Sequence, residues 1–247
     1  MGSCSQIFLS NPEFYIATCE FPNGYRFDLM PIQKASDNLY KILDQLCVMP
    51  GLPPCLYYMM SLANFKTVRK HGLVSRKVAV SKGIFVDDYS DQAVQMRRAS
   101  KIDPIYNCSI HDYVPLYFNP RNPMLYSLRE RSSDLVVLGF SPTLVDYHQK
   151  HLFADGNASS YQTIFSTDPS IITSSVDALN SRYWNNIPDG KRRRCAETLI
   201  APSLAPGFIE FAICSNHLTA DVVNDSGLNL DDRIIVEPDF FFLEGSR

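Results

Sequence analysis

Glu197 is the residue most suggestive of chemistry, because it is the one acid in a short segment that starts with four cations. The segment from Lys191 to Ile200 reads KRRRCAETLI. Thr198 to Ile200 favour extended structure, and a carboxylate inside a strand is costly to bury without a partner or a task. Cations directly before it indicate that the task involves an anion. From this stretch alone, the alternative is a glutamate in an edge strand beside a solvated basic turn.

A second candidate for anion binding is the pair Arg97 and Arg98, in a predicted helix from Ser90 to Ser100. A guanidinium presents a rigid fork of donors to a phosphate or carboxylate. Adjacent helical residues point about 100° apart, so only one of the two can face inward. The alternative is that both belong to a solvated helix face.

Two aromatic segments complete the candidate chemistry. Residues 111–126, HDYVPLYFNPRNPMLY, predict a strand followed by a loop that prolines hold. Its aromatics, with Met124 beside them, could stack on a flat heterocycle or could belong to a core strand. Tyr183 and Trp184 lie shortly before the basic run. Aromatics interleaved with cations are typical of a groove for single-stranded nucleic acid, although a core tryptophan beside a solvated turn fits equally well.

The composition limits the classes of protein to consider. The chain has 247 residues, of which 45% are hydrophobic and 20% charged, as in globular proteins with a sizeable core. With a net charge of −3, nucleic-acid binding must depend on local basic patches. Seven scattered cysteines show neither a CxxC pair nor a zinc spacing, so we expect reduced thiols in a cytoplasmic protein without a metal site. No apolar run approaches the ~20 residues of a membrane span.

The elements that must position these residues fall into two parts. Residues 5–33 predict a hairpin with a turn at 21–24, and residues 36–48 predict an amphipathic helix. The PGLPP run at 50–54 breaks the chain. We therefore expect an N-terminal extension over 1–50, packed on a main body over 51–247.

The main body predicts an α+β fold with a central, mostly antiparallel sheet. Ser61 and Gly72 have the residue types that begin and end a helix after the first strand. No P-loop, GxGxxG, GxSxG or HExxH motif is present. The expected strands are 56–60, 134–140, 208–214 and 234–242, the further helices begin at 141 and span 174–184, and a polar turn covers 155–160.

Four pieces of the chain, taken in order, resemble the DarT family of DNA ADP-ribosyltransferase toxins. They are LYYMMSLANFKTVRKHGL at 56–73, QMRR at 95–98, HDYVPLYFNPRNPMLY at 111–126 and RRCAETLI at 193–200. The resemblance covers about residues 55–245. It implies a fold of the ADP-ribosyltransferase superfamily, in which a split central sheet forms a cleft for NAD. It also implies NAD-dependent transfer of ADP-ribose to a base in single-stranded DNA.

The resemblance assigns roles to individual residues. Glu197 and Arg98 would be catalytic, with Arg97 as the alternative arginine, and Tyr117 would stack on the nicotinamide. The residues implied to contact NAD are Tyr58, Met60, Gly72, Leu73, Arg98, Tyr117 and Met124. Those implied to bind DNA are Tyr183, Trp184, Lys191, Arg192, Arg193 and Arg194.

Two departures from the family pattern concern the choice of substrate. Tyr58 stands where the family commonly has histidine, and Cys195 stands where many members have glutamine. The acceptor therefore stays open between thymine and guanine. The alternatives are an acceptor in RNA or protein, or a non-enzymatic relative that binds nucleic acid. As a toxin, the protein would require an antitoxin partner, typically a macrodomain hydrolase that removes the adduct.

Overall fold

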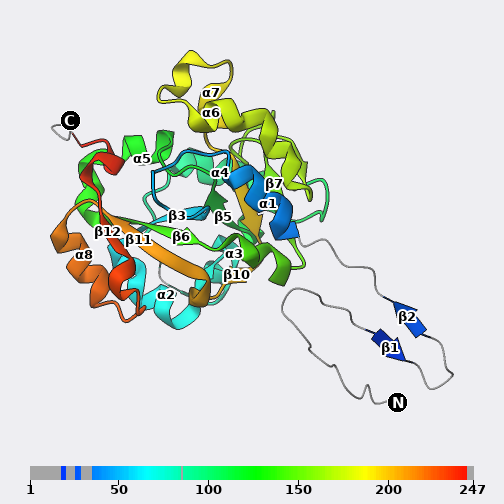
Figure 1. Cartoon of the computed structure of the whole chain (residues 1–247), viewed down its shortest axis with the longest axis horizontal. Coiled ribbons are helices and arrows are strands. Elements are labelled where there is room, and N and C mark those ends of the chain that lie inside the picture. The colour runs from blue at the N-terminus through cyan, green and yellow to red at the C-terminus, as the bar shows by residue number, and fades with distance from the viewer. Residues whose placement is uncertain (1–17, 21–25, 29–34, 85, 244–247) are drawn as a thin grey trace.

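A central eight-stranded sheet organises the computed structural model, which describes residues 18–20, 26–28, 35–84 and 86–243 (Figure 1). The strand order is β12-β11-β6-β3-β5-β9-β7-β8, and every neighbouring pair is antiparallel except β11 and β12. The strands are β3 Leu56–Ser61, β5 Val114–Tyr117, β6 Leu135–Phe140, β7 His151–Ala154, β8 Phe165–Ser166, β9 Glu197–Ile200, β11 Ile209–Cys214 and β12 Ile234–Val236. The expected α+β fold is confirmed.

The sheet is split between β3 and β5. β3 pairs with β6 along its whole length, from Leu56 to Ser61. With β5 it shares only one pair, Tyr57 opposite Tyr117. Regular pairing between the two halves therefore stops after this one pair, as the split sheet implied by the family resemblance leads us to expect.

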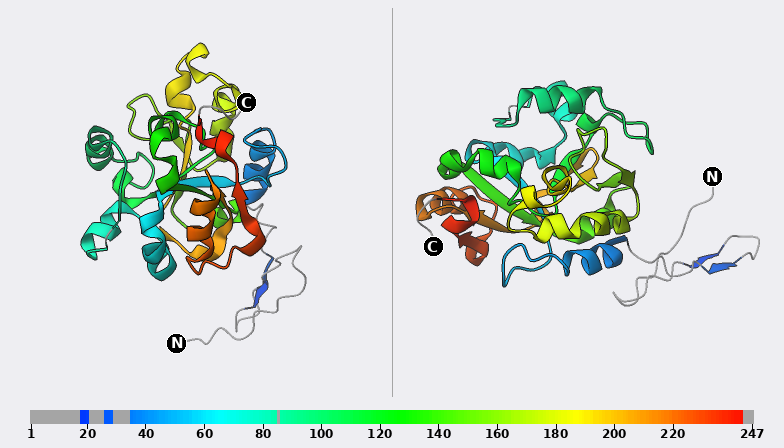
Figure 2. Two further views of the ribbon diagram at one scale, coloured as in Figure 1. Left: turned by 90° about the vertical axis from the view of Figure 1, so that its left-hand side faces the viewer. Right: turned by 90° about the horizontal axis from the view of Figure 1, so that it is seen from above.

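Helices cover both faces of the sheet. Viewed from above, α3 and α4 lie on one side and α1 on the other (Figure 2). The α-helices are α1 Ala35–Leu43, α2 Phe65–His71, α3 Arg76–Ser81, α4 Gln92–Ser100, α5 Pro123–Ser127, α6 Val176–Asn180, α7 Gly190–Arg193 and α8 His217–Asn224. The 3-10 helices are η1 Leu62–Asn64, η2 Ile110–Asp112, η3 Arg129–Asp134, η4 Pro142–Tyr147, η5 Pro169–Ser175, η6 Trp184–Asn186, η7 Pro206–Phe208, η8 Asp231–Arg233 and η9 Pro238–Phe241. Two small sheets pair β1 Thr18–Glu20 with β2 Arg26–Asp28 and β4 Leu73–Val74 with β10 Ser203–Leu204.

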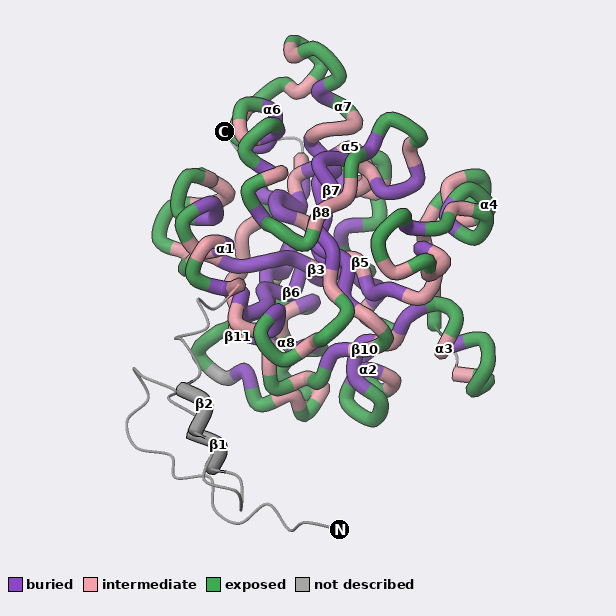
Figure 3. The backbone as a smooth tube through the Cα atoms, turned by 90° about the vertical axis from the view of Figure 1, so that its right-hand side faces the viewer, coloured by how far each residue is buried: buried purple, intermediate pink, exposed green. Residues whose placement is uncertain are grey.

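The core packs against both faces of the central strands. Leu56 and Met60 of β3 join the larger apolar cluster, while Tyr57 and Met59 point into a second one. This alternation follows from the two-residue period of a strand. Because both faces are covered, all six residues of β6 are buried, and the buried stretches of chain converge at the centre of the molecule (Figure 3).

The turn from β3 to β4 follows the expected capping. Ser61 accepts a hydrogen bond from the backbone N–H of Ala63 at the start of η1. Gly72 ends α2 with a φ of 71°, in the left-handed region that favours glycine. A Cβ atom at this position would lie 2.2 Å from the Leu204 carbonyl oxygen, so no larger residue fits without a shift of the backbone.

Several short elements differ from the sequence-based expectation. α3 and α5 form where no helix was predicted, because Ser75 and Asn122 cap their first turns. The strand expected over 234–242 ends at Val236, because Pro238 has no N–H for a ladder bond. The helix expected over 174–184 is divided among η5, α6 and η6.

The N-terminal part contributes one helix to the main core. α1 ends at Leu43, earlier than the predicted 36–48 helix, and buries Leu39, Ile42 and Leu43 in the larger cluster. β1 and β2 form an antiparallel pair, while the rest of the predicted hairpin, with its turn at 21–24, lies outside the described residues. The boundary at residue 50 stays a prediction.

Candidate active site

Glu197 is the first residue of β9 and lies within the sheet. It pairs with Tyr117 of β5 on one side and Ala154 of β7 on the other, which excludes an edge strand. The side chain is 1% exposed. A buried carboxylate needs partners, and Glu197 has two: the guanidinium of Arg98 and the backbone N–H of Ala158.

Arg98 supplies the stronger of these partners. Its Nη1 lies 3.1 Å from each carboxylate oxygen of Glu197, and its Nη2 lies 3.1 Å from Oε2. Asp91 begins α4 by accepting a hydrogen bond from the Val94 N–H, and the helix then turns Arg98 inward at 7% exposure while Arg97 stays exposed. The structure thus brings Arg98, the preferred of the two sequence-predicted arginines, to Glu197.

The loop over 155–164 delivers the second partner. The Ala158 N–H donates to Glu197 Oε1 at 2.7 Å. Arg192 holds this loop by donating to both carboxylate oxygens of Asp155, at 2.8 and 3.2 Å. The Asn157 N–H donates to the Arg192 carbonyl at 3.0 Å. The sequence predicts the polar turn but not its contact with Glu197, because neither the spacing nor the residue types of a turn specify which backbone N–H finds a partner.

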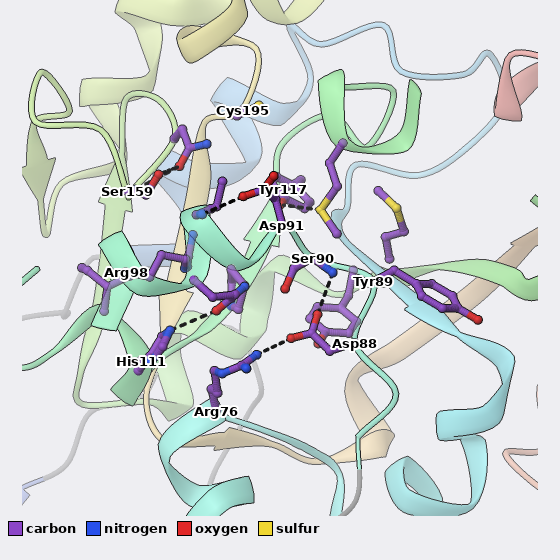
Figure 4. A pocket seen from close by; sticks show the side chains of 18 of the residues that line it. Arg76, Asp88, Tyr89, Ser90, Asp91, Arg98, His111, Tyr117, Ser159 and Cys195 are labelled. Carbon is purple, nitrogen blue, oxygen red and sulfur yellow. Dashed lines mark hydrogen bonds and ion pairs between the residues drawn. The ribbon is translucent and has the colours of Figure 1, made fainter. Parts of the chain in front are cut away.

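A cavity of about 1360 Å³ adjoins this cluster (Figure 4). Of the residues predicted to contact NAD, five line it: Tyr58, Met60, Arg98, Tyr117 and Met124. Glu197 is not in the lining, because Arg98 and its neighbours stand between the carboxylate and the cavity.

The structure does not bring Gly72 and Leu73 to the cavity. Gly72 packs on the backbone of Leu204, and Leu73 pairs with Leu204 between β4 and β10. The next residue, Val74, is part of the cavity lining. The role predicted for these two residues in binding NAD therefore has no support from their position, since the pairing of β4 with β10 occupies them.

Tyr117 and Tyr58 form an aromatic wall of the cavity. The Tyr117 hydroxyl donates to the sulfur of Met124 at 3.5 Å. Burial raises the pKa of Tyr117, and the nearby Glu197 raises it further. Burial, followed by the charge of Asp88, raises the pKa of Tyr58 to about 12. Both phenols are therefore neutral near pH 7 and able to donate a hydrogen bond.

Another part of the lining is polar and was missed from the sequence. Arg76 forms an ion pair with Asp88, and Asp87 accepts from the Ser61 hydroxyl at 2.7 Å. His111 lies 2.9 Å from the Gln95 side-chain oxygen. Burial and the charges of nearby arginines lower the pKa of His111, so the imidazole is neutral near pH 7. The available signal in the sequence was Arg76 followed by the acidic pair Asp87 and Asp88, but no hydrophobic periodicity indicated that they share a wall.

Three of the four cations predicted to bind DNA are occupied by the protein itself. Arg194 donates to the carbonyls of Arg121, Ala178, Leu179 and Ser181, at 2.6 to 3.0 Å. Burial lowers the pKa of Arg194 to about 10. Because this value is still well above 7, the guanidinium is charged near pH 7. Arg193 pairs with Asp177, and Arg192 with Asp155. Lys191 is exposed and lines the cavity.

Of the two aromatic residues upstream of the basic run, one packs against the protein and the other is exposed. Trp184 packs edge-on against Tyr126 and Phe242, with ring centroids 6.2 Å apart in both cases. Tyr183 is exposed. Neither belongs to the cavity lining, so the structure does not bring this pair to Glu197.

The described part of the chain contains no group of three or more histidine, cysteine, aspartate or glutamate residues placed to hold a metal ion. Within the same residues, none of the helices combines the length and the apolar character that a membrane crossing requires.

Comparisons with known proteins point to one family. The chain matches the model of the family described as "ssDNA thymidine ADP-ribosyltransferase, DarT" over residues 57–242. A DNA ADP-ribosyl transferase–DNA ADP-ribosyl glycohydrolase fusion protein of Thermosipho africanus is 28% identical over 193 residues. That match covers 76% of this chain and 49% of the fusion protein, so this chain spans about half the length of that relative.

Solved structures with the same fold include two ADP-ribosyltransferases. The Thermosipho africanus DarTG complex with ADP-ribose has a TM-score of 0.67 and 27% identity, covering 78% of this chain and 52% of that one. The Thermus sp. 2.9 DarT complex with ADP-ribosylated single-stranded DNA has a TM-score of 0.65 and 19% identity, covering 75% of this chain and 94% of that one.

Proposed function

The chain belongs to the DarT family of ssDNA thymidine ADP-ribosyltransferases, and from this premise we propose that it transfers ADP-ribose from NAD to a thymine base in single-stranded DNA. The observation that carries the proposal is the buried Glu197 carboxylate, which Arg98 and the Ala158 N–H hold beside a large cavity. The family description favours thymine over guanine as the acceptor. The complex of the Thermus relative with ADP-ribosylated single-stranded DNA supports DNA over RNA or protein.

The cavity lining suits a dinucleotide. Its volume of about 1360 Å³ exceeds the ~300–1000 Å³ typical of drug-sized ligands, which leaves room for NAD and an incoming base. Tyr117 and Met124 offer an apolar surface for the nicotinamide ring, and Tyr58 adds a hydroxyl donor. Arg76 and Arg98 supply positive charge for the pyrophosphate.

The proposed reaction breaks the bond between the nicotinamide nitrogen and the ribose C1′ and joins C1′ to a base nitrogen. Nicotinamide leaves with the bonding electron pair, and the base nitrogen loses its proton. Glu197 would stabilise the positive charge that develops on the ribose ring, because its carboxylate is desolvated and already oriented. The same carboxylate would then take the proton from the base.

Arg98 would change partners during this reaction. In the structure its guanidinium covers the Glu197 carboxylate. An NAD pyrophosphate competes for the same donors, so binding of NAD would draw the guanidinium away and open Glu197 to the ribose. The pair thus keeps a buried carboxylate neutralised until NAD is present.

As a DNA-modifying enzyme, the protein would act as the toxin of a toxin–antitoxin system. We expect a macrodomain hydrolase as its antitoxin, since the Thermosipho relative combines a DNA ADP-ribosyl transferase with a DNA ADP-ribosyl glycohydrolase in one chain. We place its action in the cytoplasm, because NAD and DNA occur together there and the described cysteines are free thiols.

Incubation with labelled NAD and separate pools of single-stranded DNA, RNA and protein tests the proposal. We expect label in the DNA pool alone. Label found only in the RNA pool, or only in the protein pool, would mean that this class of molecule is the acceptor and DNA is not. If NAD is neither consumed nor shifts the thermal unfolding midpoint, the non-enzymatic alternative holds instead.

A further inference from the structure

Tyr161 is an aromatic residue with no packing role at the rim of the cavity. Its side chain is 89% exposed, although it lines the same cavity as Arg98 and Tyr117. Among the described residues, no hydrogen bond or ring contact holds it. A single exposed aromatic is common on protein surfaces, so its position relative to Glu197 and to free charges must decide whether it has a task.

The loop that carries Tyr161 is closed and anchored. Its ends meet where the Asp155 N–H donates to the Ile164 carbonyl and the Ile164 N–H donates to the Asp155 side chain. Inside, the Thr163 hydroxyl donates to the Asn157 carbonyl at 2.6 Å. Three residues before Tyr161, the Ala158 N–H binds Glu197. The aromatic ring is therefore carried on a rigid loop that also contacts the proposed catalytic carboxylate.

Two helices grip this loop, and each presents a free cation beside it. Lys101, at the end of α4, donates to the Ser160 carbonyl, and Arg192 of α7 binds Asp155. One helical turn before Lys101 lies Arg97, and directly before Arg192 lies Lys191. Both Arg97 and Lys191 are exposed, line the cavity, and have no ion pair among the residues that the structure describes.

We propose that Tyr161, Arg97 and Lys191 form the surface that holds the acceptor DNA strand. The inference rests on the proposed function and replaces the sequence-predicted arginines 192–194 as the phosphate contacts. Tyr161 stacks on a base next to the acceptor base, and the two cations contact phosphates on either side. Aromatic stacking tolerates any base, while cations follow the backbone, which is the usual combination for single strands.

Direct binding, measured without NAD, tests the stacking role. Fluorescence anisotropy of a labelled single-stranded oligonucleotide should show a Kd about 5- to 150-fold higher for Tyr161→Ala, and a Kd close to that of the native protein for Tyr161→Phe. Tyr147→Ala is the matched control, because Tyr147 is also exposed but lies outside the cavity lining. An unchanged Kd for Tyr161→Ala, or an equal loss for Tyr147→Ala, would overturn the proposal.

The salt dependence of binding tests the two cations. Arg97→Gln and Lys191→Gln should each weaken binding and lower the slope of log Kd against log salt by about 0.7. Lys41→Gln in α1 is the control, since this exposed lysine lies in a helix that contributes nothing to the cavity lining. Slopes equal to that of the native protein for both variants would overturn the assignment of phosphate contacts.

Two further arms separate this inference from the proposed function. In the transfer reaction, Tyr161→Ala should raise the KM for the oligonucleotide and leave the KM for NAD unchanged. Suppose that Tyr161→Ala loses DNA binding but the native protein transfers no ADP-ribose to DNA. That result would support the DNA-binding surface and would count only against the assignment as an enzyme. If Tyr161→Ala weakens the binding of an RNA strand of the same length but not that of the DNA strand, DNA is overturned as the occupant.

Discussion

At the scale of single residues, the Arg98–Glu197 pair is the centre of the proposed chemistry. Both side chains are buried, and the arginine fork meets both carboxylate oxygens. Removal of either partner would leave the other charge unpaired, which typically costs about 3–5 kcal/mol. Substitutions that keep a polar or charged group are therefore the informative ones, because truncations confuse loss of function with loss of fold.

Arg98→Lys should lower kcat by about 100-fold or more, whereas Arg97→Lys should stay near the native rate. A lysine keeps the charge but cannot reproduce the fork that meets both oxygens. Lysine at position 97 keeps the exposed cation that the DNA strand is proposed to need. Steady-state transfer kinetics on a single-stranded oligonucleotide measure both variants, and equal losses would mean that the choice of Arg98 over Arg97 is mistaken.

The thiol of Cys195 should be slow to react. Burial, with the charge of Glu197 as the next cause, raises its pKa to about 12. Since the thiolate is the reactive form, a raised pKa lowers reactivity at pH 8. Iodoacetamide should therefore alkylate the exposed Cys47 before Cys195, as mass spectrometry of peptides can show. Faster labelling of Cys195 would show that its thiolate is more populated and more accessible than its burial implies.

At the scale of elements, the loop over 155–164 acts on Glu197 through its backbone. Arg192 of α7 braces the loop through Asp155, and the loop delivers the Ala158 N–H. This makes Arg192 a positioning residue. A displacement of the N–H would misplace the carboxylate, and a misplacement of about 1 Å can lower rates by about 10- to 100-fold.

Arg192→Gln should reduce kcat by about that factor with little change in the KM for NAD, because Arg192 borders the cavity but the residues proposed to contact NAD lie on other elements. Asp155→Asn should give a similar loss, and the double variant should lose little more, since both break one brace. Arg193→Gln is the control, as Arg193 pairs with Asp177 outside this loop. Losses that add in the double variant, or a raised KM for NAD, would argue for separate roles.

Elements with a strong local signal could be predicted from the sequence, and those that depend on distant partners could not. The helix between Ser61 and Gly72 has its cap residue and its terminating glycine within the segment. The short helices α3 and α5 begin at single caps without apolar periodicity. The basic run is similar: Arg192 has a local partner in Asp189, but Asp155 and Asp177 lie 37 and 16 residues from the arginines that they bind, so these arginines looked available for DNA.

At the scale of the whole molecule, the split sheet creates the cavity while one continuous half supports it. β6 pairs with β3 on one side and β11 on the other. Gly139 of β6 lies under the ring of Phe211, where an added Cβ would be 2.4 Å from the ring carbon Cζ. The same ring packs edge-on against Tyr57, the residue at the point where the sheet splits.

Gly139→Ala should therefore destabilise the protein by about 1–3 kcal/mol, since the ring must move in a filled core. Phe211→Leu in the same chain should recover part of the loss by making room. Gly207→Ala is the control, because nothing lies within 4 Å of its added Cβ. Urea unfolding measures all three, and a neutral Gly139→Ala would show that the contact with Phe211 is easily relieved.

The division of the chain at residue 50 illustrates what a local break can predict. α1 ends at Leu43, before the PGLPP run at 50–54, and its residues Leu39, Ile42 and Leu43 share the core of the main body. A break in secondary structure is visible in composition, whereas shared burial depends on which faces meet in three dimensions. The central sheet was predictable for the opposite reason, since its longer strands β3, β6 and β11 are largely apolar runs in the sequence itself.

Mass spectrometry of nucleosides from single-stranded DNA incubated with the protein and NAD tests the central claim most directly. The native protein should yield ADP-ribosylated thymidine, and Glu197→Gln, which keeps the shape of the side chain without its charge, should yield none while it still unfolds in a single cooperative thermal transition. Equal amounts of adduct from Glu197→Gln, or unmodified DNA with the native protein while NAD is consumed, would contradict the account.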